Sequence, residues 1–139
     1  MCRLHASAGC FRTPLGLSIP IMQDPTNMLV RVQNLSKEYR RGQTLVSALQ
    51  DVTLDVKAGE FCAFVGPSGC GKSTLLNLIG GLDQPTAGII AIENRPVTHA
   101  SATEWTRLRR ELIGIVFQAF HLIPGLTVAE NVASPLLMK

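Results

Sequence analysis

Long hydrophobic runs are missing from this sequence. Its longest apolar stretches, such as residues 88–92 and 113–117, are far shorter than the roughly 20 residues that a membrane-spanning helix needs. The first part of the chain is interrupted by Pro14, Gly16 and Pro20, where a signal peptide would need a continuous apolar segment. We therefore expect neither a membrane-spanning helix nor secretion.

Cysteine pairs and runs of like charge are also missing. The 4 cysteines, at positions 2, 10, 62 and 70, form no C-x-x-C pair and have no histidines at ligand spacing, which argues against a zinc site or a disulfide framework. The cysteine pattern fits a reducing cytosol. The net charge is only +3, and no segment gathers the roughly five like charges of a nucleic-acid-binding arm. No nucleic-acid partner is expected.

The pattern of apolar residues divides the chain into a leader and one domain. Residues 1–27 show neither helical nor strand periodicity, so we predict a disordered N-terminal extension. Structure-like patterning begins at Met28, and residues 28–139 are enough for one domain core. Within that domain, residues 29–32 and 52–56 predict an antiparallel strand pair with one solvated face, because the second segment alternates cleanly with polar residues.

Two unbroken apolar segments predict buried strands. Residues 61–65 read FCAFV and end at a glycine, which favours a strand that is buried on both faces at the centre of the sheet. Residues 113–117, with Gly114 among them, predict a second apolar strand, ending at Gln118. Between them, leucines and an isoleucine at helical spacing within residues 75–79 predict a helix that stops at Gly80 and Gly81.

Two capping patterns predict further helices. Ser101 with Glu104, and Thr127 with Glu130, have the spacing of a capping box, in which each side chain bonds the other residue's backbone. We expect one helix to begin after Ser101 and another after Thr127.

The segment between the buried strand and its helix carries the chemistry. It reads GPSGCGKST and fits the pattern G-x-x-x-x-G-K-[ST]. Glycines let the backbone turn tightly so that its N–H groups point at phosphate oxygens. Lys72 would bind the β and γ phosphates of ATP, and the Ser73 hydroxyl would bind Mg²⁺. The predicted nucleotide-binding residues are Gly66, Pro67, Ser68, Gly69, Cys70, Gly71, Lys72, Ser73 and Thr74.

Alternatives remain open at this segment. A glycine-rich turn could simply join a strand to a helix and leave Lys72 in solvent. Cys70 could be a redox switch beside a phosphate site, or only a small residue that the loop tolerates. Because the motif lies between a predicted strand and a predicted helix, we favour the phosphate-binding loop and the unreactive cysteine.

The sequence resembles the ATP-binding subunits of ABC transporters from about Met28 to its last residue. The resemblance rests on NLSKEYRRG at residues 34–42, on residues 49–88 around the loop, and on IGIVFQAFHLIPGLTVAENV at residues 113–132. It looks closest to the branch that serves lipoprotein release, macrolide export and cell division. The implied fold is α/β, a P-loop NTPase with a mainly parallel central sheet, N-terminal antiparallel strands and an incomplete helical subdomain.

The resemblance adds two residues to the site. Tyr39 matches the aromatic residue whose ring stacks on adenine, although a tyrosine packed at a strand end is the alternative. Gln118 matches the glutamine that contacts Mg²⁺ and the attacking water, although a glutamine at a strand end could simply face solvent. Lys72 and Gln118 are thus the expected catalytic residues, and Ser73 and Gln118 the expected metal ligands.

Several family motifs have no counterpart in these 139 residues. There is no serine-glycine-glycine-glutamine signature and no apolar strand ending in aspartate and glutamate, and the histidines at 5, 99 and 121 come too early for the switch histidine. We therefore expect the N-terminal part of an ATP-binding domain that binds ATP without hydrolysing it. A non-hydrolysing fragment or a decayed gene product is the alternative to a transport ATPase.

The resemblance also implies partners and a location. Two ATP-binding subunits would form a homodimer around ATP, and a transmembrane permease would dock in the groove near residues 118–126. The protein would then be cytoplasmic and peripheral on the inner face of the plasma membrane. A GTPase is excluded because Asp83 does not begin a D-x-x-G motif, and a small-molecule kinase would not explain Tyr39 or Gln118.

Overall fold

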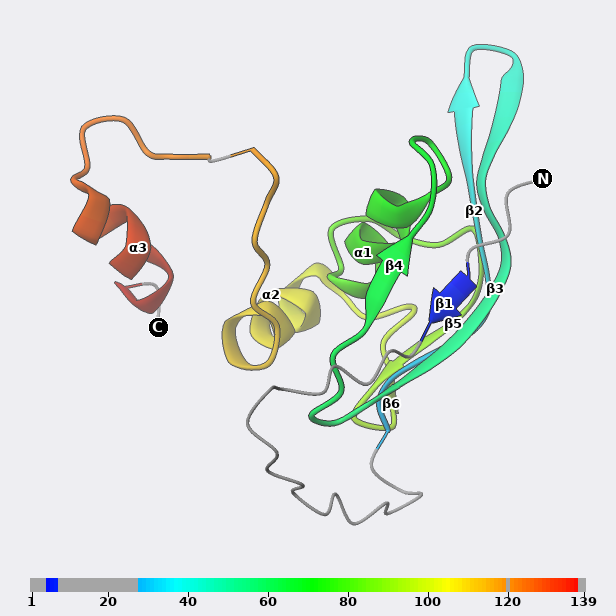
Figure 1. Cartoon of the computed structure of the whole chain (residues 1–139), viewed down its shortest axis with the longest axis horizontal. Coiled ribbons are helices and arrows are strands. Elements are labelled where there is room, and N and C mark those ends of the chain that lie inside the picture. Colours follow the sequence, from blue (N-terminus) through cyan, green and yellow to red (C-terminus); the bar gives the residue numbers. More distant parts are fainter. Residues whose placement is uncertain (1–4, 8–27, 120, 138–139) are drawn as a thin grey trace. The chain divides into compact units, whose positions relative to one another are not determined.

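The computed structural model describes residues 5–7, 28–119 and 121–137. These residues form two compact units, one within residues 1–100 and one within residues 101–139, and each is described by itself. The elements of the first unit (Figure 1) are β1 (His5–Ser7), β2 (Met28–Arg41), β3 (Thr44–Lys57), β4 (Ala63–Val65), α1 (Lys72–Ile79), β5 (Ala87–Ile92) and β6 (Arg95–Pro96).

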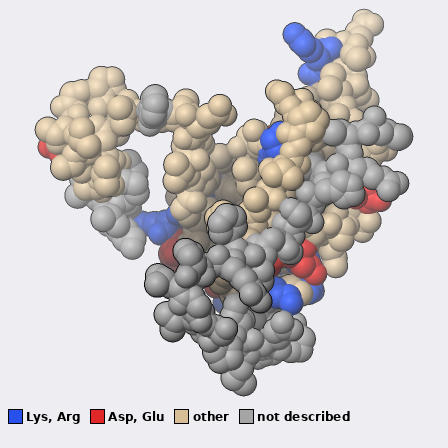
Figure 2. Space-filling view, viewed as in Figure 1, with Lys and Arg blue, Asp and Glu red and all other residues tan. Residues whose placement is uncertain are grey.

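A four-stranded antiparallel sheet of order β3-β2-β5-β6 dominates the first unit. The predicted antiparallel pair is confirmed, since β2 and β3 form a long hairpin in which Val32 faces Leu54 across the ladder. Thr53 and Asp55 are exposed, while the alternating residues Val52, Leu54 and Val56 are half-buried, as one solvated face requires. The far end of this hairpin, at the upper right in Figures 1 and 2, carries basic side chains, and Arg40 and Arg41 are exposed there.

The core of the first unit combines residues of the sheet with residues of α1. The largest fully buried side chains are Val32, Leu35, Leu75, Leu78 and Ile90. The spacing of Leu75 and Leu78 places both on one face of the helix, and that face is directed into the core. Gly81 follows the helix with φ of +64°, which confirms the predicted left-handed stop.

The strand before the phosphate loop differs from its prediction. β4 covers only Ala63–Val65, and Phe61 and Val65 are 73% and 60% exposed. The expectation of a strand buried on both faces is therefore wrong for the described structure. A strand becomes buried only when neighbouring strands and helices cover it, and β1 is the only described strand that pairs with β4. All described strand pairs are antiparallel, so the expected parallel neighbours of β4 are not among them.

Part of the leader is structured. His5–Ser7 form β1 and pair antiparallel with Ala63–Val65 of β4. The expectation of disorder therefore does not hold for these three residues, which add backbone hydrogen bonds along one edge of β4. Residues 1–4 and 8–27 lie outside the described residues. The division at Met28, where β2 begins, stays a prediction as a domain boundary.

The second unit contains α2 (Ala102–Glu111) and α3 (Val128–Leu137), and both predicted capping boxes are confirmed. Glu104 N–H donates to Ser101 Oγ at 3.2 Å, and Glu130 N–H donates to Thr127 Oγ1 at 3.3 Å. The predicted strand at residues 113–117 is wrong, because this segment has no regular structure and no described strand pairs with it. Neither helix, nor any other described helix, has the length and apolar character that crossing a bilayer requires.

Candidate nucleotide-binding site

The predicted phosphate loop lies where the sequence places it, between β4 and α1. Gly66 to Gly71 form the turn, and Lys72, Ser73 and Thr74 make the first turn of the helix. Leu75 N–H donates to the Gly71 carbonyl at 2.9 Å, which begins the helical ladder. The N–H groups of the first helical turn have no acceptor within the helical ladder, so an anion at the positive end of α1 could accept from them.

Two glycines of the loop are required by its backbone. Gly69 and Gly71 have φ of +80° and +95°, a region that side chains with a Cβ rarely adopt. A Cβ on Gly71 would also lie 2.6 Å from the Ala48 carbonyl oxygen and 2.7 Å from Leu49 Cδ2 of β3. The start of α1 thus lies directly against the sheet, which fixes the loop on a rigid support.

The Lys72 side chain is folded back into the loop. Its ammonium donates to the carbonyl oxygens of Gly66 at 2.8 Å and Pro67 at 2.7 Å. The chain's own neutral carbonyls thus hold the one cation of the loop at its centre. Phosphate oxygens would be stronger acceptors for the same ammonium, because hydrogen bonds to a charged acceptor are stronger than those to a neutral one. Together with the glycine backbone, this arrangement fits a nucleotide phosphate.

The loop cysteine is packed inside the turn. Cys70 is only 9% exposed, and a Cβ on Gly66 would lie 2.8 Å from its sulfur. The Lys72 ammonium is 3.5 Å from the same sulfur. Cys62 lies in the segment predicted as a buried strand, but it is partly exposed. The observed strand begins only at Ala63, and among the described strands only β1 pairs with it. The tight packing of Cys70 favours the interpretation of a small residue that fits the loop over that of a redox switch.

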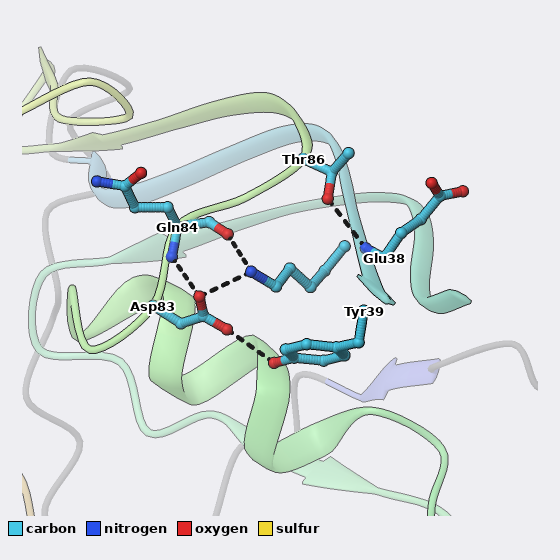
Figure 3. A network of polar contacts seen from close by, with 6 residues as sticks. Glu38, Tyr39, Asp83, Gln84 and Thr86 are labelled. Atoms are coloured by element: carbon cyan, nitrogen blue, oxygen red, sulfur yellow. Dashed lines mark hydrogen bonds and ion pairs between the residues drawn. The ribbon is translucent and has the colours of Figure 1, made fainter. Parts of the chain in front are cut away.

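Tyr39 lies near the C-terminal end of β2, next to the segment that follows α1. Its hydroxyl donates to Asp83 Oδ2 at 2.8 Å, and the Lys37 ammonium lies 4.8 Å from the ring centroid (Figure 3). The Tyr39 residue is 40% exposed. Burial and the hydrogen bond to Asp83 raise the pKa of Tyr39, although the Thr74 side chain acts to lower it.

Asp83 is a residue that the sequence interpretation did not assign. It follows the end of α1 and accepts hydrogen bonds from Lys37 Nζ at 2.7 Å, Tyr39 and the Gln84 N–H. Burial acts to raise the pKa of Asp83, but these hydrogen bonds outweigh it and hold that pKa below its ordinary value. The sequence did indicate that Lys37 and Tyr39 could bind one common partner, because residues two apart on a strand share one face. It did not indicate that this partner is Asp83.

Gln118, the second predicted catalytic residue, belongs to the second unit. It is exposed and lies in a bend after the irregular segment 113–117. Tyr39 and the phosphate loop both belong to the first unit, whereas Gln118 belongs to the second. Close to Gln118, the rings of Phe117 and His121 are 5.0 Å apart.

Comparison with known proteins decides the family. The family model described as ABC transporter matches residues 49–138, which include the whole loop. This chain belongs to the ABC transporter family. The relatives it resembles include an uncharacterised ABC transporter ATP-binding protein, MJ0796 of Methanocaldococcus jannaschii, which is 47% identical over 111 residues. That match covers 80% of this chain and 47% of the relative.

Other relatives agree with this assignment. The macrolide export ATP-binding/permease protein MacB of Agrobacterium fabrum is 44% identical over 79% of the chain and 17% of its own length. A solved dimeric structure of the ATP-binding cassette MJ0796, in a post-hydrolysis state bound to ADP and Pi, superposes with a TM-score of 0.74 at 47% identity. It is covered over 48% of its length, and this chain over 80%. The fold is thus that of a P-loop ATPase cassette, and the chain spans about half or less of the relatives that it matches.

Proposed function

We propose that this ABC-family chain binds Mg-ATP and that it serves, in the full-length protein, an ATP-driven transporter. The Gly66–Thr74 backbone and Lys72 would hold the phosphates, and Ser73 would bind Mg²⁺. Tyr39 would stack on adenine. The observation that carries the proposal is the Lys72 ammonium, which is held by two carbonyls inside a turn with left-handed glycines at the start of α1. Such a turn is a preformed anion cradle.

Hydrolysis would require more than this cradle. Gln118 would orient the attacking water and contribute to Mg²⁺, as the resemblance implies. The family's other catalytic motifs have no counterpart in these 139 residues. We infer that a polypeptide of these residues alone binds ATP without measurable turnover, because removing even one group that stabilises the transition state costs about a hundredfold in rate.

The second unit has exposed apolar side chains that could bind a partner protein. Leu122 and Ile123 are 66% and 45% exposed, and Val128 is 82% exposed at the start of α3. The Asn131 side chain organises this segment, since it accepts from Ile123 N–H at 2.8 Å and donates to the Thr127 carbonyl at 3.0 Å. An ordered segment with exposed apolar side chains is typical of a protein-binding surface. We propose that a permease docks on residues 118–126, and that a second copy completes the ATP site.

The branch and location of the transporter are also proposals. MacB relatives are named for macrolide export, which supports one function of the branch, while lipoprotein release rests on sequence resemblance alone. A permease partner would hold the protein at the inner face of the plasma membrane. The transported substrate is not defined by any residue described above.

The test is nucleotide binding with a matched pair of lysine variants. Titration with fluorescently labelled ATP and Mg²⁺ should show saturable binding by the wild-type chain. Lys72→Ala should weaken it at least tenfold, because it removes the charge within the loop. Lys57→Ala, which removes an exposed lysine at the end of β3, should not. Equal binding by all three proteins would overturn the proposed function.

A further inference from the structure

Lys37 and Asp83 form a clamp around Tyr39. Lys37 is only 9% exposed although it is charged, and its ammonium donates to Asp83 Oδ1 at 2.7 Å and to the Gln84 carbonyl at 2.6 Å (Figure 3). The other carboxylate oxygen of Asp83 accepts the Tyr39 hydroxyl at 2.8 Å. One carboxylate thus holds both a buried cation and the tip of the ring.

The clamp leaves one side of the ring for a ligand. The Lys37 ammonium lies 4.8 Å from the centroid of the Tyr39 ring, where it makes a cation–π contact. Because this contact covers one face and the hydroxyl is held, a planar group that stacks on the ring would have to meet the opposite face. The Tyr39 residue is 40% exposed.

The clamp is fixed to the phosphate loop through α1. Asp83 lies just after this helix, whose first residue is Lys72, and the following segment is bound back to β2. Thr86 N–H donates to the Ser36 carbonyl at 2.9 Å, and Glu38 N–H donates to Thr86 Oγ1 at 3.0 Å. The segment after α1 is therefore bound to β2 on either side of Lys37, at Ser36 and at Glu38.

We propose that Lys37 and Asp83 are positioning residues that hold the Tyr39 ring in the orientation in which the face opposite Lys37 meets the base of the nucleotide. This inference rests on the proposed ATP binding and goes beyond it. A tyrosine on an exposed strand would otherwise rotate about its side-chain bonds, and binding would have to order it. The clamp orders the Tyr39 ring before the ligand binds. The contribution of the clamp to affinity should therefore appear in the binding of the base and not in that of the phosphates.

A purely structural role is the competing explanation. A partly buried ion pair can also act only on folding, because loss of one partner leaves the other charge without compensation. Such a role would change the binding of every ligand alike, or of none. Comparison of ATP with inorganic tripolyphosphate, which has no base, separates the two explanations.

The experiment measures dissociation constants for both ligands, with Mg²⁺, in four proteins: wild type, Asp83→Asn, Tyr39→Phe and Asp55→Asn. Asp55→Asn is the matched control, since it removes an exposed ion pair with Arg31 on the same sheet. Asp83→Asn and Tyr39→Phe should each weaken ATP binding about three- to tenfold and change tripolyphosphate binding less than about twofold. The control should change neither. Circular dichroism verifies folding, and Tyr39→Phe, which keeps the ring, carries the test if Asp83→Asn does not fold.

A second readout uses the single tyrosine of the chain. Absorbance of the phenolate reports Tyr39 alone, and its titration midpoint should fall in Asp83→Asn because the hydrogen bond that favours the protonated phenol is lost. Equal losses for ATP and tripolyphosphate, or an unchanged ATP affinity in folded variants, would overturn the clamp while leaving ATP binding intact. Wild-type protein that binds neither ligand would instead overturn the proposed function on which the clamp rests.

Discussion

The Lys72 ammonium lies 2.8 Å from the carbonyl oxygen of Gly66, at the opposite end of the phosphate loop. The same ammonium also meets the Pro67 carbonyl, so the loop is closed by its own lysine. This relationship gives the lysine a role in the free protein as well as in the proposed complex. Variants of the loop lysine should therefore differ in ATP binding and in turnover from variants elsewhere in the site.

Lys72→Ala and Gln118→Ala should damage different steps. The comparison uses a protein in which this chain is joined to the C-terminal half of a related ABC ATPase. Lys72→Ala should weaken ATP binding and abolish turnover, because Lys72 would contact phosphate already in the ground state. Gln118→Ala should spare binding and lower turnover about a hundredfold, because Gln118 would act in the transition state. Labelled-nucleotide titration and phosphate release measure the two steps. Equal loss of binding in both variants would contradict these roles.

Gly71→Ala should destabilise the fold more than Gly42→Ala. Both glycines have positive φ, +95° and +63°, and alanine there costs about 1–2 kcal/mol in each case. A Cβ at Gly42 meets nothing within 4 Å, whereas at Gly71 it lies 2.6 Å from the Ala48 carbonyl oxygen. The clash should add about 1–3 kcal/mol. Urea unfolding gives the free energy of each variant, and equal losses would mean that the helix start is not seated against β3.

Cys62 should be alkylated faster than Cys70 in the absence of nucleotide. Cys62 is partly exposed, whereas Cys70 is buried inside the loop, and a buried thiol reacts slowly because reagent access is limited. Mg-ATP should slow Cys70 further and leave Cys62 unchanged. Iodoacetamide labelling followed by mass spectrometry of the two peptides gives both rates. Faster labelling of Cys70 would show that the loop is open in solution.

The clamp should make stability depend on pH through Asp83. Its folded pKa lies below the ordinary value, so its contribution is complete above about pH 5 and is lost as the pH falls through the folded pKa. Asp83→Asn should therefore lose less unfolding free energy than wild type between about pH 5 and pH 2. Urea unfolding at several pH values measures the difference. Parallel pH profiles for the two proteins would mean that Asp83 is not ionised in the clamp.

Much of the site was predictable because its chemistry is local. The glycines and the lysine of residues 66–74 predict a phosphate loop from their spacing alone, and the helix that follows is present as predicted, as Lys72–Ile79. The capping boxes at Ser101 and Thr127 are equally local, since both partners lie within one helical turn. Tyr39 was assigned to the site by resemblance, and the structure shows its hydroxyl bound to Asp83, which follows α1.

The sequence by itself determined the elements whose hydrogen bonds and side-chain contacts close within a few residues: the phosphate loop, the helix caps and the alternation of β2 and β3. Only the tertiary structure decided what depends on distant partners. Residues 113–117 are apolar enough for a strand but have no strand structure, and Phe61 is exposed although its segment reads as buried. A strand needs a neighbour for its backbone and a cover for its side chains. For the same reason Asp83, 44 residues from Tyr39, became part of the site only when β2 and the end of α1 came together.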